Sequence, residues 1–256
     1  MPKKPSYLRG LIFTLCFYST TSLILILLLP TLALPYRHAS MCYRLWSKCA
    51  ILMLHGICGV KLQLKGMERL PKMGNPYIIA SAHQSTYETL IFNVLFPQCR
   101  FIIKKELQQL PFFGWYMRKS QFIAIDRKAK GKVIKSLMTQ AKNILHQQAP
   151  IVIFPHGTRI PADNPRPIKH SGLQALLTLS KEAEFKEIPI FPVRMNTGYI
   201  WPRRGLKFYP GIITIEIMPA IDKHLDGKEL IKAIETTIND VPALLPAKQA
   251  FHSDDW

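Results

Sequence analysis

The chain has 256 residues, which is enough for one sizeable globular domain with a modest appendage. Lys and Arg total 34 against 16 Asp and Glu, so the formal net charge is +18, a balance typical of proteins that meet a nucleic acid, an anionic membrane surface or a phosphorylated substrate. The five cysteines form no Cys-x-x-Cys pair, which argues against a zinc site and, with their odd number, against a disulfide framework.

The first predicted element is a membrane-spanning helix over residues 10–34. No charged residue occurs between Arg9 and Arg37, and a helix that crosses the hydrocarbon core needs about 20 apolar residues. A cleaved signal peptide would have a shorter apolar region that ends in a small-residue cleavage site, whereas the sequence after Leu34 is a poor one. Three basic residues precede the block and favour a cytoplasmic N-terminal tail: Lys3, Lys4 and Arg9.

A second helix is predicted over residues 41–60. Basic side chains recur among its apolar ones at near-helical spacing: Arg44, Lys48 and His55. Such a basic amphipathic helix can lie in the membrane interface, and a core helix of the following domain fits the pattern equally well. We therefore expect a membrane-associated helical segment over residues 1–60, followed by a folded domain over residues 61–256.

From residue 60 onwards, short β-like runs alternate with helical stretches. The predicted strands lie at residues 61–64, 77–80, 101–103, 122–125, 151–154, 188–191 and 212–217, and the predicted helices at residues 86–95, 132–148, 173–184 and 228–238. This alternation predicts an α/β fold with a mixed, largely parallel sheet flanked by helices. In such sheets ligands bind beyond the carboxyl ends of the strands, so the residues after each run are candidates for chemistry.

His83 and Glu88 follow the second predicted strand. On a continuous helix, residues five positions apart lie about 140° apart and cannot pair. If His83 lies in the turn and Glu88 in the first turn of the next helix, the carboxylate can orient the imidazole and stabilise its protonated form. Ser85-x-x-Glu88 is also a capping box, so the sequence leaves a catalytic pair and a helix cap as alternatives.

Other strand ends carry residues suited to an anion. The fifth predicted strand is followed by Pro155-His156-Gly157-Thr158-Arg159, in which Gly allows close approach, Thr can donate a hydrogen bond and Arg offers a bidentate fork to phosphate. The alternative is an ordinary turn with a solvated Arg. Basic residues also follow the third and fourth predicted strands: Lys104, Lys105 and Arg127. Their shared place beyond strand ends makes a common anion site the more specific hypothesis.

In this order, the segments resemble the motifs of the 1-acylglycerol-3-phosphate acyltransferase family of glycerolipid acyltransferases. The family pattern is a His and an acid five positions on, a Lys-rich segment with Pro-x-x-Gly and a terminal Arg, a Phe-Pro-Glu-Gly-Thr-Arg block, and an Ile-Pro-Ile-x-Pro-Val strand. The matching residues are His83 and Glu88; Lys105, Pro111, Gly114 and Arg127; Phe154 to Arg159; and Ile188 to Val193. Glu88 replaces the usual Asp, Gln121 a Gly and His156 a Glu, so a carboxylate is missing beside the expected phosphate site.

The resemblance implies transfer of a fatty acyl group from acyl-CoA or acyl carrier protein to the sn-2 hydroxyl of lysophosphatidic acid, giving phosphatidic acid. His83 would be the general base, oriented by Glu88, because imidazole titrates near neutral pH. The expected phosphate-binding residues are Gly157, Thr158, Arg159, Lys105 and Arg127. No Gly-x-Ser-x-Gly elbow or metal motif is present, so direct transfer without a metal or other cofactor is expected.

The resemblance also predicts the partners and the location. Membrane lipids, a lysophospholipid acceptor and the acyl donor are the expected partners, and the catalytic domain is expected at the cytoplasmic face of a membrane. Two alternatives keep the fold: another lysophospholipid or lyso-aminolipid as acceptor, and a catalytically silent lipid-binding relative. A membrane-tethered nucleic-acid-binding protein is a third, but the basic residues form no recognised nucleic-acid motif, so no nucleic-acid partner is expected.

Overall fold

The computed structural model describes residues 5–127, 129, 132–185, 188–203, 205–222 and 224–241. Within these residues, seven strands form one sheet in the order β1-β7-β6-β2-β5-β3-β4, parallel throughout except between β6 and β7. The strands are β1 (Val60–Lys65), β2 (Ile78–Ser81), β3 (Arg100–Lys104), β4 (Ile123–Ile125), β5 (Ile151–Ile153), β6 (Ile190–Met195) and β7 (Gly211–Ile217). The predicted fold class is confirmed, and each predicted strand is present.

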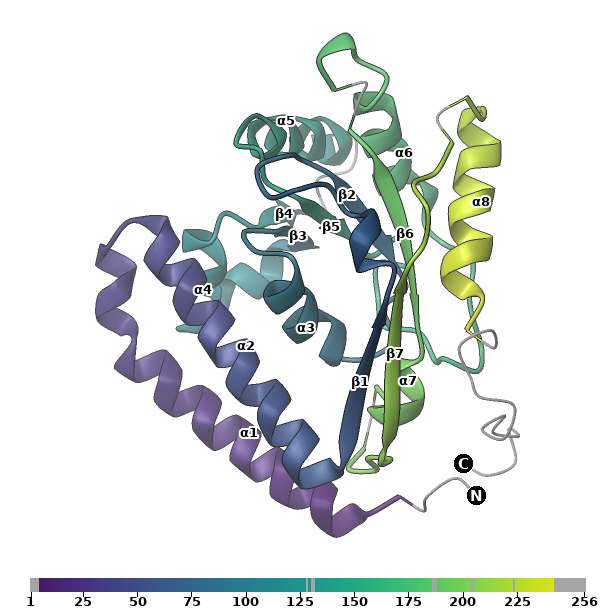
Figure 1. The fold of residues 1–256 in the computed structure, drawn as a ribbon. Helices are drawn as coiled ribbons and strands as arrows, with labels where there is room; N and C mark the ends of the chain where they lie inside the picture. The colour runs from purple at the N-terminus through teal and green to yellow at the C-terminus, as the bar shows by residue number, and fades with distance from the viewer. Residues whose placement is uncertain are drawn as a thin grey trace.

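Helices cover both faces of this sheet (Figure 1). They are α1 (Tyr7–Leu27), α2 (Tyr36–Cys58), α3 (Tyr87–Leu95), α4 (Phe113–Lys119), α5 (Lys132–His146), α6 (His170–Leu179), α7 (Thr197–Ile200) and α8 (Gly227–Asn239), with 3₁₀ turns η1 (Leu29–Ala33), η2 (Met67–Arg69), η3 (Lys105–Gln109) and η4 (Ala183–Phe185). The helix predicted over residues 173–184 is instead α6 followed by η4. Neither α4 nor α7 was predicted, because such short helices hold too few turns to show a period.

Alternate residues of the central strands contribute to two hydrophobic cores, one on each face of the sheet. Ile79 and Val152 pack with residues of α1, α2 and α3, in a cluster rich in aromatic rings. Ile78 and Ile151 pack with α5, α6 and α8, in a cluster of mainly aliphatic side chains. Because the central strands are buried on both faces, they appear in the sequence as short continuous apolar runs.

Helix α1 is shorter than the predicted span and lies along the folded domain (Figure 1). It ends before Pro30, which lies in η1, since proline removes a helix hydrogen bond and clashes with the preceding turn. In the described part of the chain, α1 is the one helix long and apolar enough to cross a membrane. Both of its ends contact the domain: the Phe13 ring meets the Phe208 ring, and the Tyr116 hydroxyl donates to the Leu25 carbonyl at 3.4 Å. Whether α1 spans a bilayer stays a prediction.

Helix α2 begins five residues before the predicted element and ends at Cys58, because Gly59 is left-handed (φ 67°) and stops the helix. One of its faces is buried, with residues at helical spacing: Ala39, Tyr43, Trp46, Ala50 and Leu54. The opposite face exposes Met41, Leu45 and Leu52. Helix α2 is therefore a core helix that also presents apolar side chains to its surroundings. The predicted division of the chain into two parts at residue 60 stays a prediction. One hydrophobic core contains residues from both sides of that position.

Candidate active site

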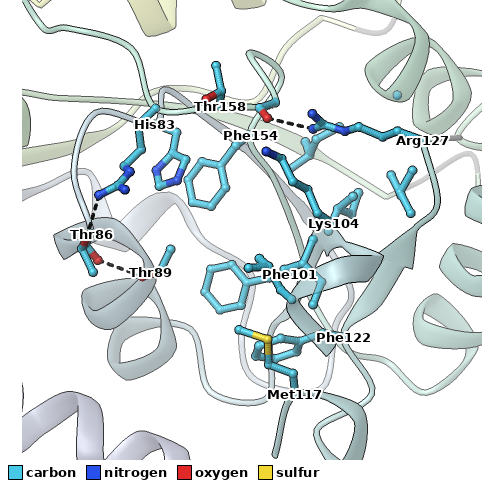
Figure 2. Close-up of a pocket in the computed structure, with 18 of the residues that line it drawn as sticks. His83, Thr86, Thr89, Phe101, Lys104, Met117, Phe122, Arg127, Phe154 and Thr158 are labelled. Carbon is cyan, nitrogen blue, oxygen red and sulfur yellow. Dashed lines mark hydrogen bonds between the residues drawn. The ribbon is translucent and has the colours of Figure 1, made fainter. Parts of the chain in front are cut away.

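The predicted site segments meet at one edge of the sheet. Strands β2, β5, β3 and β4 are consecutive neighbours and all parallel, so their carboxyl ends lie together. His83 follows β2, Gly157 to Arg159 follow β5, and Arg127 follows β4. All of them line one cavity. Figure 2 shows His83, Thr158 and Arg127 around it, with the rings of His83 and Phe154 side by side; the ring centroids are 4.4 Å apart and their planes differ by 22°.

His83 and Glu88 face one another as the bent-chain hypothesis required. Helix α3 begins at Tyr87, so His83 lies in the preceding turn and Glu88 in the first helical turn. The His83 Nδ1 atom lies 3.5 Å from Glu88 Oε2, and it has no closer hydrogen-bond partner among the described residues. This distance is longer than that of an ordinary N–H···O hydrogen bond, which is roughly 2.7–3.2 Å. Catalytic hydrogen bonds are often long without substrate and shorten when it binds.

The Glu88 carboxylate is fully buried and held by several donors. It accepts from the backbone amides of Gln84 and Ser85 at 3.1 and 2.9 Å and from the Thr197 hydroxyl. The bonds from residues 84 and 85 hold the turn before α3, whose N-cap residue, Thr86, makes no side-chain cap bond. Glu88 therefore both fixes that turn and faces His83. A buried carboxylate is costly unless it is hydrogen-bonded, and these donors fix it in place.

Arg159 and Gly157 lie in the loop after β5, and both line the cavity together with Thr158. The Arg159 guanidinium donates to the Thr86 hydroxyl at 3.0 Å, which holds it beside the start of α3. Gly157 is left-handed (φ 68°), and a Cβ atom there would lie 2.8 Å from the Arg127 guanidinium. The Gly157 carbonyl accepts from that same Arg127 group at 2.8 Å (Figure 2).

The two predicted basic candidates of the second motif behave differently. Arg127 lines the cavity, whereas Lys105 does not: its ammonium group pairs with Asp126 at 3.2 Å and is half exposed. Lys104, the last residue of β3, lines the cavity instead, whereas Lys105 is the first residue of the turn η3. The geometry therefore supports Arg127 and Lys104, rather than Lys105, as groups that can meet a ligand.

The cavity has a volume of about 940 Å³ and two unlike ends. Near His83 it is cationic, and the described lining contains no Asp or Glu: the basic residues are Lys104, Arg127, Arg159, Lys169 and Arg203. The other end is apolar and reaches α1 and α2, with Phe17, Leu25, Tyr43, Trp46, Phe101, Met117 and Phe122 in its walls. Figure 2 shows Phe101, Met117 and Phe122 on the side away from Thr158. A phosphorylated headgroup suits the first end and a hydrocarbon chain the second.

His156 does not face this cavity, contrary to the expectation that it replaces a carboxylate beside the phosphate site. Its side chain is buried, and its Nε2 atom lies 3.1 Å from the Asn239 side-chain oxygen at the end of α8. Burial lowers the pKa of His156, an effect that Glu235 and Asn239 partly oppose. The ring is therefore a neutral packing group between β5 and α8 at neutral pH.

Sequence reasoning missed several residues of the site. Thr197 follows the end of β6 and binds Glu88, so the rule about carboxyl ends of strands could have found it. Gln84 accepts from the Gly198 amide at 3.0 Å and thereby joins the same two loops. Lys169 and Arg203 carry a weaker signal, because neither directly follows a strand: Lys169 lies at the far end of the loop between β5 and α6, and Arg203 lies beyond α7. In the described residues no group of three His, Cys, Asp or Glu side chains is arranged for a metal.

Comparisons with known proteins agree with these motifs. The Acyltransferase family model matches residues 61–196, more than half of the chain. Over 186 residues, the chain is 32% identical to the 1-acyl-sn-glycerol-3-phosphate acyltransferase of Pseudomonas aeruginosa, which covers 73% of this chain and 69% of that protein. It is 28% identical to the protein of the same name from Saccharomyces cerevisiae, covering 76% of this chain and 62% of that one.

A solved structure shares the fold. The crystal structure of the 1-acyl-sn-glycerophosphate (LPA) acyltransferase PlsC from Thermotoga maritima aligns with a TM-score of 0.74 and 22% identity, over 96% of this chain and 99% of that one. The solved structure shows the shared fold, the family model identifies an acyltransferase, and the relative in P. aeruginosa, at 32% identity, shows the narrower family. The chain belongs to the 1-acyl-sn-glycerol-3-phosphate acyltransferase family.

Proposed function

We propose that this protein transfers a fatty acyl group from an acyl thioester to the sn-2 hydroxyl of lysophosphatidic acid, giving phosphatidic acid. One observation carries the proposal: His83, paired with Glu88, lines a cavity that is apolar at one end and cationic at the other, where the described lining holds no Asp or Glu. The names of the relatives in P. aeruginosa and S. cerevisiae point to the same reaction. An acceptor with a positively charged headgroup fits the acid-free lining less well.

In the proposed reaction, His83 takes the proton of the acceptor hydroxyl through Nε2 while the oxygen attacks the thioester carbonyl. Glu88 faces Nδ1 and stabilises the imidazolium that forms. The tetrahedral intermediate collapses, the C–S bond breaks, and the imidazolium returns the proton to the leaving thiolate. This direct transfer requires neither a protein nucleophile nor a cofactor.

Arg159 is the proposed ligand of the acceptor phosphate. Its guanidinium donates a hydrogen bond to Thr86, which lies three residues after His83 in the chain. The guanidinium is therefore held against the loop that carries the proposed base. In lysophosphatidic acid, the phosphate is only a few bonds from the sn-2 hydroxyl, which matches that arrangement. Gly157 and Thr158 complete the loop, and Arg127 and Lys104 supply further charge at the same end.

Acyl-CoA and acyl carrier protein are both proposed donors, since both present the acyl group as a thioester of phosphopantetheine. Purified protein, reconstituted with lysophosphatidic acid, should be assayed with oleoyl-CoA and with oleoyl carrier protein. His83→Ala should lower the rate about 10²- to 10⁴-fold. His146→Ala is the matched control, because His146 also faces a carboxylate, Glu184 at 3.2 Å, but on the surface. Unchanged turnover in His83→Ala would refute the proposed base, and no turnover of lysophosphatidic acid by the wild type would refute the acceptor.

The proposed location is the cytoplasmic face of a membrane. Helix α1 exposes Leu8, Leu15, Leu23 and Leu27. Leu110 and Phe112, between η3 and α4, and Trp115 in α4 are also exposed, and α4 meets the end of α1 through the Tyr116–Leu25 hydrogen bond. Exposed apolar patches of this kind mark membrane or protein contacts, and the net charge of +18 favours an anionic lipid surface. Leu15→Glu with Leu23→Glu should reduce sedimentation with anionic vesicles, whereas Met73→Glu, which changes an exposed residue elsewhere, should not.

A further inference from the structure

Arg203 is a cation of the cavity that lies outside every motif of the family. It follows α7, beyond the last residue that the family model matches. Its side chain lines the same cavity as Arg159, and its guanidinium donates to the Arg159 carbonyl at 3.2 Å. Within the described residues no carboxylate forms an ion pair with Arg203. Arg203 thus adds a second cation beside the loop of Arg159, and a guanidinium group is well suited to bind a phosphate.

Helix α1 holds the segment that carries Arg203. The Phe13 ring meets Trp201 edge-on at 5.2 Å and Phe208 at 5.1 Å, so it contacts both ends of that segment. The Ser6 amide donates to the Phe208 carbonyl at 3.3 Å. Gly10 provides the closest approach, since a Cβ atom there would lie 1.9 Å from the Leu206 carbonyl oxygen. The apolar helix is thus packed against the backbone that positions Arg203.

We propose that Arg203 is a second ligand of the acceptor phosphate, alongside Arg159, and that α1 positions it. The inference rests on the proposed function and extends it to a residue that no family motif contains. It also gives α1 a role in substrate binding in addition to membrane attachment. A phosphate monoester presents three oxygens, and one guanidinium in a bidentate contact satisfies two of them, so a second guanidinium has an oxygen to bind.

The position of Arg203 favours the phosphate of the acceptor, rather than a phosphate of the donor, as its ligand. Arg203 contacts Arg159, and Arg159 contacts Thr86 on the loop of His83. The acceptor phosphate lies a few bonds from the hydroxyl that must reach His83. The nearest phosphate of a phosphopantetheine thioester lies at the far end of a long arm. At the same end of the cavity, Arg127 and Lys169 both lie against Gly157. A phosphate near His83 therefore belongs to the acceptor.

Arg203→Ala tests the first part of the proposal. Its side chain is exposed, so the variant should fold. The KM for lysophosphatidic acid should rise about 10-fold or more, the loss expected for a hydrogen bond between charged groups, while the KM for the donor changes less than about twofold. Arg203→Lys should restore part of the affinity. Arg37→Ala removes the same charge from an exposed site on α2 and should leave both constants unchanged. The assignment would be overturned if both KM values rose equally or if neither rose.

Gly10→Ala tests the second part, and Gly56→Ala is its matched control. Both replace a helical glycine by the best helix former, but a Cβ atom at Gly56 meets nothing within 4 Å. Gly10→Ala should raise the KM for lysophosphatidic acid, with little change of kcat or of membrane sedimentation, and Gly56→Ala should behave as wild type. Adding Gly10→Ala to Arg203→Ala should cost little more, because both act on one contact. Full additivity, or a loss confined to kcat, would refute positioning by α1.

A binding measurement separates this inference from the proposed reaction. The probe is 2-deoxy-lysophosphatidic acid, which has the phosphate but no hydroxyl to acylate, and Trp201 beside Arg203 provides a fluorescence signal. Wild-type binding that weakens about 10-fold or more in Arg203→Ala supports the phosphate site even if the wild type does not acylate lysophosphatidic acid. Binding of equal strength in both proteins, with an active wild type, would refute the role of Arg203 and leave the proposed function intact.

Discussion

The two ends of the cavity are built in different ways. The cationic end consists mainly of residues that follow parallel strands, such as His83, Arg127 and Arg159, and its residues are brought together by the register of β2, β5, β3 and β4. The apolar end consists of side chains from α1, α2, α4 and the strands, such as Leu25 and Met117, whose segments are far apart in the chain. Chemical specificity at the first end depends on a few polar groups, whereas shape at the second depends on the packing of whole helices. Substitutions at the two ends should therefore fail in different ways.

The largest effect is expected at the carboxylate that faces the proposed base. Glu88→Gln should lower kcat about 10²- to 10⁴-fold, within the range of general-base assistance, because an amide cannot stabilise the imidazolium of His83. Glu88→Asp should retain much of the activity, since Asp is the usual residue of the family motif. Glu184→Gln, at the exposed partner of His146, is the matched control. Steady-state kinetics would contradict this role if Glu88→Gln and Glu184→Gln gave the same rate.

Next in size is the loss of the phosphate ligand at the cationic end. Arg159→Ala removes a guanidinium that is fixed on Thr86 and should raise the KM for lysophosphatidic acid at least about 10-fold. Turnover of monoacylglycerol, an acceptor without the phosphate, should not fall with it. The ratio of the two specificity constants measures the effect, and an equal loss for both acceptors would remove the assigned role.

At the apolar end, a substitution should change chain-length preference rather than headgroup affinity. Leu25 lines the cavity, so Leu25→Trp should fill part of its apolar end. Turnover of the longest acyl chains should fall about 10-fold relative to short ones, since one methylene group in an apolar pocket changes substrate discrimination by about 10- to 200-fold. Leu23→Trp, an exposed position on the same helix, should leave the preference unchanged. A competition assay with mixed chain lengths would reveal a uniform loss, which would contradict a chain-binding role.

The smallest effect concerns stability behind the cationic end. Burial lowers the pKa of His156 in the folded state, while the unfolded chain takes up its proton near pH 6.5. Below that pH the unfolded state binds more protons than the folded state. His156 therefore lowers the free energy of unfolding as the pH falls from about 6.5 towards its folded pKa, and it has no such effect above about pH 6.5. His156→Gln keeps a polar partner for Asn239 and should flatten this decline. Thermal unfolding of both proteins between pH 7.5 and 5.5 measures it, and parallel curves would contradict the prediction.

The strands and the cationic end were largely predictable from the sequence. Buried parallel strands appear as short apolar runs, and residues such as His83 and Arg159 follow those runs directly, so one topological rule placed them together. Lys105 shows where that reasoning fails: its neighbour Lys104, the last residue of β3, lines the cavity, whereas Lys105 begins the turn η3. The motif alone does not fix which of the two adjacent lysines faces the cavity. His156 shows the same limit, since its side chain lies against α8 and not in the cavity.

The sequence by itself determined the fold class and placed His83, Glu88 and the basic loop after β5 beyond the ends of strands, because each depends on local periodicity or on residues next to one another in the chain. Only the tertiary structure decided that Thr197 binds Glu88, that α1 and α2 wall the apolar end, and that Arg203 lies beside Arg159. These contacts join segments more than 40 residues apart, and their geometry is set by how helices pack on the sheet. Local sequence patterns carry no record of such distances, so the part of the cavity that is proposed to hold the hydrocarbon chain could be found only in the folded protein.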